Sequence, residues 1–201
     1  MKKILLFTAA LILISIASFS QDFITYKGAG KIILNTGDTI KGNLSYSLTF
    51  PRKVRLVLDG KDENYNYDQV KEFFLDNRHY ITIKTRVIGN PNTFALLMGT
   101  ETDRIRLFKY EQQPMMDGPG GIVPITTEYY VSLPGEEFAM GLMDMKLIPF
   151  NKKMAKVVEG CPALAKKIAD KEDGYKMGLI SNDLIRLPVY QRIAAEFEQC
   201  K

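Results

Sequence analysis

The chain has 201 residues, with 27 lysines and arginines against 23 aspartates and glutamates, and a formal net charge of +4. This mild, mixed charge lacks the strongly basic character that nucleic-acid-binding proteins usually have. The length fits one domain, or two small ones, with a core large enough to fold without metals or many disulfides.

The first 20 residues are expected to form a secretory signal peptide. Lys2 and Lys3 precede a nearly unbroken apolar run, Ile4–Ile16, and small residues follow at 17–20. This order is the secretory pattern, and the run is shorter than the roughly 20 apolar residues of a membrane-spanning helix. Cleavage after Ser20 leaves 25 basic residues against 23 acidic ones, a net charge of about +2. The alternatives are a cut two residues earlier and an uncleaved N-terminal anchor. Export to the periplasm or the cell surface is therefore expected.

Residues 21–147 are expected to form an antiparallel β domain. In 39–50 apolar side chains fall on even positions and polar ones on odd positions, and 54–58 repeats the rule. A period of two is the signature of a strand with one buried face. The segment 67–74 fits neither a strand nor a helix period. Five further segments are predicted to be strands: 79–87, 94–98, 104–110, 128–133 and 137–142.

The turn Asn35–Asp38 is expected to join the first two strands as a hairpin. Gly37 adopts a positive φ at low cost, and Asp38 can hydrogen-bond to nearby backbone. A calcium site on Asp38 is the alternative, but one carboxylate supplies too few ligands for calcium. Gly42, inside the second strand, predicts a bulge or a close crossing, as at the corner of a small barrel.

The apolar period changes to that of helices in the C-terminal quarter. A short helix is expected to stop at Gly160, and a second to run from Pro162 to Gly174. A third is expected to begin at Pro188, with apolar residues at steps of three and four. These helices are expected to form a cap, 148–201, that packs on the sheet.

Cys161 and Cys200 are the only cysteines of the chain. An exported protein meets an oxidising compartment, so a single disulfide between them is expected, with two unpaired buried thiols as the alternative. The complete expectation is an α+β fold. It consists of a twisted antiparallel sheet, or a partly open small β-barrel, with a short C-terminal helical cap.

His79 is the only histidine, so every Ser-His-Asp or Cys-His arrangement must include it. It stands in the segment Asp76–Tyr80, which reads as a turn before a strand, and a solvent-facing position is expected. One histidine and two paired cysteines supply no zinc or copper site of ordinary ligand spacing. No catalytic residue, metal or cofactor is therefore assigned.

Acidic pairs are the other residues with possible chemistry, because paired carboxylates hydrolyse glycosides. The acidic pairs are Asp62-Glu63, Glu136-Glu137 and the acids of 170–173. They stand at turns or at a helix end, where solvated acids are common. Methionines at 115, 116, 140, 143 and 145 fit an adaptable packing surface, with a Cu(I) site as the alternative.

The motif Gly30-x-Ile-x-Leu-x-x-Gly-Asp-Thr-Ile-x-Gly42, together with Cys161-Pro-x-Leu164 and Cys200, resembles an uncharacterised family of exported Bacteroidetes proteins. The resemblance covers both ends of the mature chain. It implies export and paired cysteines, and it adds no catalytic residue. The residue pattern of the first motif is also similar to that of small SH3-like or Sm-like barrels. This similarity is an analogy of shape and does not establish function.

The expected function is that of an exported, non-catalytic protein that binds a partner protein, a glycan or another cell-envelope component. This expectation depends on the lack of a recognisable nucleophile–base pair and of a set of metal ligands in the sequence. The alternative is a hydrolase that acts on an envelope polymer through acidic residues.

Overall fold

The computed structural model describes residues 24–49, 52–58, 60–86, 92–101, 103–113, 124–142, 149–177 and 182–200. The expected signal peptide lies outside these residues. So do the expected boundary between sheet and helices at 147–148 and the methionines at 115, 116, 143 and 145.

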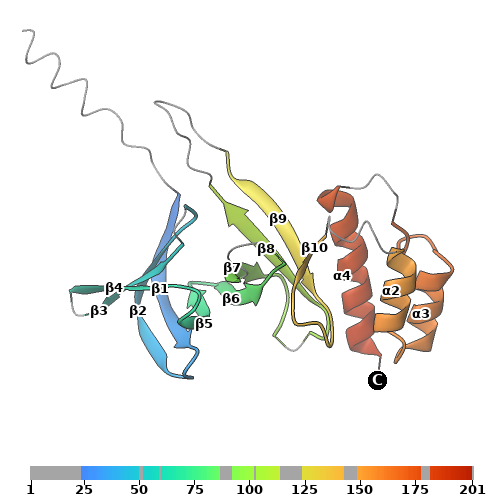
Figure 1. Ribbon diagram of the computed structural model, residues 1–201, viewed down its shortest axis with the longest axis horizontal. Coiled ribbons are helices and arrows are strands. Elements are labelled where there is room, and N and C mark those ends of the chain that lie inside the picture. The colour runs from blue at the N-terminus through green and yellow to red at the C-terminus, as the bar shows by residue number, and fades with distance from the viewer. Residues whose placement is uncertain are drawn as a thin grey trace, which may run out of the picture.

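The fold is α+β, as the sequence predicts, and its main element is an open sheet of ten antiparallel strands (Figure 1). Their order in the sheet is β10-β9-β8-β7-β6-β5-β1-β2-β3-β4. The strands are β1 (Thr25–Leu34), β2 (Thr39–Ser47), β3 (Val54–Leu58), β4 (Lys61–Tyr65), β5 (Val70–Leu75), β6 (Arg78–Lys84), β7 (Asn92–Leu97), β8 (Arg106–Gln112), β9 (Thr126–Ser132) and β10 (Met140–Gly141). The segment with no clear period thus contains strand β5, and the last expected strand is reduced to two residues.

The sheet curls tightly around an aromatic cluster. Tyr46 of β2 and Phe94 of β7 are separated by three strands in the sheet, which in a flat sheet is a distance of about 19 Å. Their ring centroids are nevertheless 5.9 Å apart. Phe73 and Tyr80 fill the space between them and stack on each other at 4.6 Å. All four residues are buried, so the curl encloses an apolar core without help from the helices.

Contacts at the strand ends hold the curl together. The end of β8 reaches the far side of the curl, where the side chain of Gln113 accepts a hydrogen bond from the backbone of Ile24 at 2.8 Å. The backbone N–H of Gln113 donates to the carbonyl of Leu48 at 3.2 Å. The hydroxyl of Tyr26 donates to Glu111 at 3.3 Å. These contacts bring β8 to β1 and β2 although other strands separate them in the sheet.

The turn between β1 and β2 has the contacts of a structural corner. Gly37 has a φ of +95°, and its N–H donates to the carbonyl of Leu34 at 2.9 Å. The Asp38 carboxylate accepts a hydrogen bond from the Thr36 hydroxyl at 2.7 Å. The Asn35 amide donates to the carbonyl of Asp68 at 2.7 Å, which ties the corner to the turn before β5.

Two glycines face each other in the paired strands β1 and β2. Gly30 of β1 pairs with Gly42 of β2 in the register. A Cβ at position 30 would lie against the backbone carbonyl of Phe74, and a Cβ at position 42 would lie 2.7 Å from Cδ1 of Leu56. The absence of side chains here lets neighbouring groups approach the two strands closely.

Three helices are described, and they pack against the other end of the sheet. They are α2 (Phe150–Val157), α3 (Pro162–Ala169) and α4 (Asp183–Gln199). In Figure 1 α4 stands between β10 and the pair α2–α3. One apolar cluster joins Leu107 and Val131 of the sheet to Met154, Ile168 and Ile193 of the helices. The cap therefore covers the β8–β9 end of the sheet and not the curl.

Two expected helix boundaries are wrong. The helix after Pro162 ends at Ala169 and not at Gly174, because Lys171 has a φ of +56°, which no right-handed helix accommodates. The last helix begins before Pro188 and contains it, because the Asn182 side chain caps the N-terminus by accepting a hydrogen bond from the backbone of Ile185.

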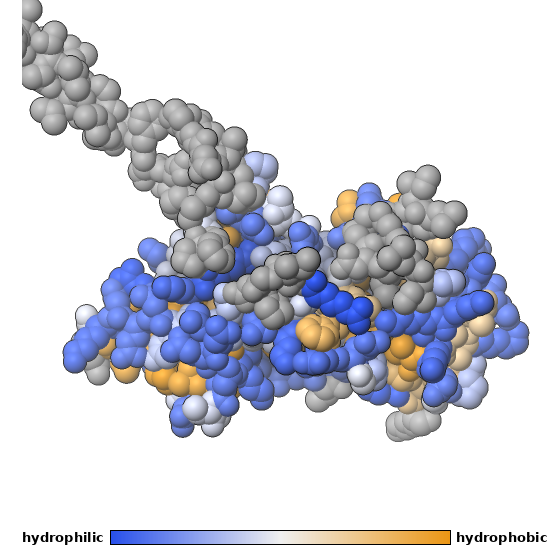
Figure 2. Space-filling view, in the orientation of Figure 1, coloured by the Kyte–Doolittle hydropathy of each residue, from blue (hydrophilic) through white to orange (hydrophobic). Residues whose placement is uncertain are grey.

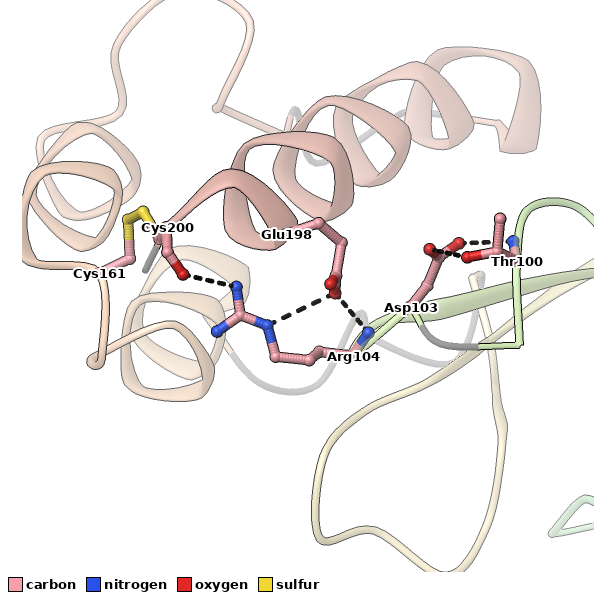
Figure 3. A network of polar contacts seen from close by, with 6 residues as sticks. All are labelled: Thr100, Asp103, Arg104, Cys161, Glu198 and Cys200. Carbon is pink, nitrogen blue, oxygen red and sulfur yellow. Dashed lines mark hydrogen bonds and ion pairs between the residues drawn. A yellow bond between two sulfur atoms is a disulfide. The ribbon is translucent and has the colours of Figure 1, made fainter.

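The expected disulfide joins Cys161, at the start of α3, to Cys200, at the end of α4, with Cα atoms 5.8 Å apart. It lies beside a polar network that ties α4 to the turn between β7 and β8 (Figure 3). Arg104 donates from its backbone N–H to Glu198 and from Nη2 to the carbonyl of Cys200 at 3.2 Å. Among the residues that the structure describes, no helix is both long and apolar enough to cross a lipid bilayer.

We expect Gly30→Ala to lower the free energy of unfolding by about 2–3 kcal/mol, because the added Cβ would clash with the backbone carbonyl of Phe74, which cannot rotate away as the end of a side chain can. Gly42→Ala should cost less, since the end of the Leu56 side chain can shift and the Val57 carbonyl, 3.1 Å from the added Cβ, is a milder contact than the Phe74 carbonyl. Gly37→Ala, which strains φ but meets no neighbouring atom, should cost about 1 kcal/mol. Denaturant unfolding measures all three, and equal losses at positions 30 and 37 would contradict the close packing around Gly30.

Burial raises the pKa of Tyr80 to about 12, against the opposing effect of Arg78. A raised tyrosine pKa contributes stability that is complete below the unfolded-state pKa of about 10 and is lost as the pH rises through the folded-state value. Between pH 9 and pH 12 the free energy of unfolding should therefore fall by about 2 kcal/mol less in Tyr80→Phe than in the wild type. Parallel pH profiles for the two proteins would refute this.

Candidate functional site

A groove of about 460 Å³ is lined by side chains from both faces of the sheet. Thr82 and Lys84 are on the same face as Tyr80, and the ring of Tyr67 is 6.2 Å from that of Phe94 in the aromatic cluster. The floor of the groove includes Ile81, Ile83 and Phe108, which belong to a separate apolar cluster. Ile81 follows Tyr80 directly in β6, and successive side chains of a strand point to opposite faces. The volume lies in the range of ligand-binding clefts.

The rim of the groove is polar and carries more cations than acids. Lys71, Lys84 and Arg106 stand against Asp68 and Glu137. Lys84 forms an ion pair with Glu137 at 2.9 Å, and both side chains are more than half exposed. Within the described residues Arg106 has no ion-pair partner. The rim therefore offers cationic donors to a ligand in the groove.

Amide and hydroxyl groups complete the rim. The side-chain amide of Asn92 donates to Asp68 at 3.2 Å, and Asn35, Thr82 and Ser132 also line the groove. Such groups both donate and accept hydrogen bonds. Figure 2 shows one side of the molecule, on which hydrophilic residues prevail and apolar ones form small, separate patches.

A second cluster, in which Glu72, His79 and Glu101 meet, lies on the same face of the sheet as Ile81. Nε2 of His79 is 2.8 Å from a carboxylate oxygen of Glu72 and 3.3 Å from one of Glu101. Glu72 is buried, with 7% of its surface exposed. His79 and Ile81 are alternate residues of β6, and Glu72 pairs with Ile81 in the register. The cluster therefore adjoins the groove.

The position of His79 differs from the sequence expectation. It belongs to strand β6, and its side chain is only 15% exposed. Its ring stacks on Phe74, directly opposite in β5, with centroids 4.0 Å apart. A solvent-facing turn histidine is therefore the wrong interpretation. The sequence contains the polar–apolar alternation of β6, which predicts a strand from His79 onward, but it contains no signal for the partner carboxylates.

Glu101 is the residue that sequence reasoning missed. It stands in the turn between β7 and β8, 22 positions from His79, and no motif connects the two. Only the pairing of β6 with β7 brings this turn to the start of β6. Among the described residues this is the one group of three potential metal-ligating side chains in which all ligand atoms lie within 4.8 Å of one another.

The expected acidic pairs stand apart from both sites, except for Glu137 on the groove rim. Asp62 forms an ion pair with Arg55, and Asp170 forms one with Lys166. Glu136 is 3.2 Å from Lys153. Each of these acids thus has a cation partner. A hydrolytic role for them stays a prediction.

Comparisons of the chain with protein-family models, curated proteins and solved structures give no match. The groove and the histidine cluster are therefore interpreted from their own geometry.

Proposed function

We propose that the protein is exported and binds a cell-envelope glycan, without catalysis, in the groove of the sheet. The observation that carries the proposal is the rim, where three cations and several amide and hydroxyl groups surround a shallow apolar floor. Glycans are recognised by hydrogen bonds to their hydroxyl groups, which such rims supply. The excess of cations favours an acidic glycan.

Export is supported by the Cys161–Cys200 bond, because structural disulfides persist in oxidising compartments. The N-terminal sequence pattern supports it as well, as does the resemblance to exported Bacteroidetes proteins. A partner protein and another envelope component are the other binding partners compatible with this location.

Binding of an acidic oligosaccharide tests the groove directly. By calorimetry, uronate-containing oligosaccharides should bind more tightly than neutral ones, and Arg106→Gln or Lys84→Gln should weaken binding about tenfold, the effect of losing one charge-assisted hydrogen bond. The matched control is Lys166→Gln, which removes an exposed, ion-paired lysine on α3 and should leave the affinity unchanged.

Three outcomes would contradict this proposal. Equal affinities in the groove variants and the control would move the binding site elsewhere. A failure of all oligosaccharides to bind would exclude glycan recognition. Release of new reducing ends would instead support the hydrolase.

The disulfide should contribute to the free energy of unfolding, and its presence in the native protein should indicate an oxidising compartment. The bond joins residues 39 positions apart, and chain-entropy arguments assign such a loop about 4 kcal/mol. Reduction should therefore lower the midpoint of denaturant unfolding. Mass analysis of protein taken from its native cell, without reductant, should give a mass two hydrogens below that of the dithiol. A native protein with both thiols free would contradict export.

A further inference from the structure

We propose that Glu72, His79 and Glu101 form a binding site for a divalent first-row transition-metal ion. The site goes beyond glycan binding and does not depend on it. One imidazole nitrogen and two carboxylate oxygens converge from β5, β6 and the turn between β7 and β8. Such a mixed set of N and O ligands suits zinc and its neighbours in the first transition row better than calcium or magnesium, which prefer oxygen alone.

The distances fit a tetrahedral centre with small adjustments. Bonds of about 2.0–2.1 Å to nitrogen and oxygen place tetrahedral ligands roughly 3.3 Å apart. Nε2 of His79 is 3.3 Å from Glu101 and 2.8 Å from Glu72, and every pair of ligand atoms lies within 4.8 Å. A metal ion would lie where Nε2 of His79 and the two carboxylates face one another.

Neighbouring contacts fix two of the three ligands in place. The Phe74 ring lies 4.0 Å from the His79 ring in a stacked arrangement, which restricts rotation of the imidazole. Glu72 is buried in the middle of β5. A ligand whose orientation is set before binding loses less conformational entropy when the metal binds.

The turn that carries Glu101 is anchored on both sides of that residue. Asp103 accepts a hydrogen bond from the backbone of Thr100 at 2.8 Å, and a second from the Thr100 hydroxyl. Arg104 is held by Glu198 of α4 (Figure 3). Glu101 itself is 54% exposed, so a metal ion can enter the site from solvent on this side.

The charges of the site favour a divalent cation. Two carboxylates and a neutral imidazole give a charge of −2, which one divalent ion neutralises. Among the described residues Lys71 forms an ion pair with Glu72 at 3.9 Å, but its side chain is 68% exposed and therefore well screened. Lys31 lies over the Phe74 ring at 4.1 Å. Three protein ligands leave a fourth position for water or for a donor atom of a ligand in the adjoining groove.

The test is calorimetric titration of the mature protein, without a histidine tag, with Zn²⁺. We expect one ion per chain, and binding that is weakened at least about tenfold in Glu101→Gln. Glu101 is exposed, so this variant should fold normally. The matched control is Glu63→Gln, which removes an exposed carboxylate in β4 and should leave Zn²⁺ binding unchanged.

Nuclear magnetic resonance gives a readout that is independent of affinity, because the chain has one histidine. One equivalent of Zn²⁺ should shift the imidazole ¹⁵N resonances of His79 to saturation in the wild type, and Glu101→Gln should need more Zn²⁺ to reach the same shift. If those resonances do not move, or if Glu101→Gln and Glu63→Gln bind Zn²⁺ equally, the three residues form an ion pair only and the metal site is refuted.

Discussion

The packing of Tyr46, Phe73, Tyr80 and Phe94 inside one curled sheet is the interaction on which the rest of the structure depends. A long antiparallel sheet needs a buried face. The aromatic rings supply the buried area, and the paired glycines at positions 30 and 42 let neighbouring strands pack closely beside them. The opposite face of the same strands carries the apolar floor of the groove.

The turn between β7 and β8 connects the two halves of the molecule. On one side it presents Glu101 to His79. On the other, Arg104 contacts the end of α4 beside the Cys161–Cys200 bond. The helices joined by this bond therefore help to hold the turn that carries Glu101, a ligand of the proposed metal site. A rigid support of this kind is what a binding site needs if its ligands are to be placed before the metal arrives.

Local patterns in the sequence predict the local structure, but they do not predict contacts between residues that are far apart in the chain. The alternation in 39–58 and the Gly37 corner follow from side-chain periods and turn chemistry, and the disulfide follows from the cysteine count. The burial of His79 and the approach of Glu101 depend on strand pairing between distant segments, which no period encodes. The predicted start of the last helix is wrong because it places Pro188 at a first helical position, whereas the helix is capped by Asn182 and contains Pro188 in its interior.

The curl is tested most directly by nuclear Overhauser effects between the rings of Tyr46 and Phe94. Their centroids are 5.9 Å apart, although three strands separate them in the order of the sheet. Strong cross-peaks between the two sets of ring protons are predicted. Their absence, with each ring showing cross-peaks only to residues on adjacent strands, would mean that the sheet is flat and would contradict the closed core.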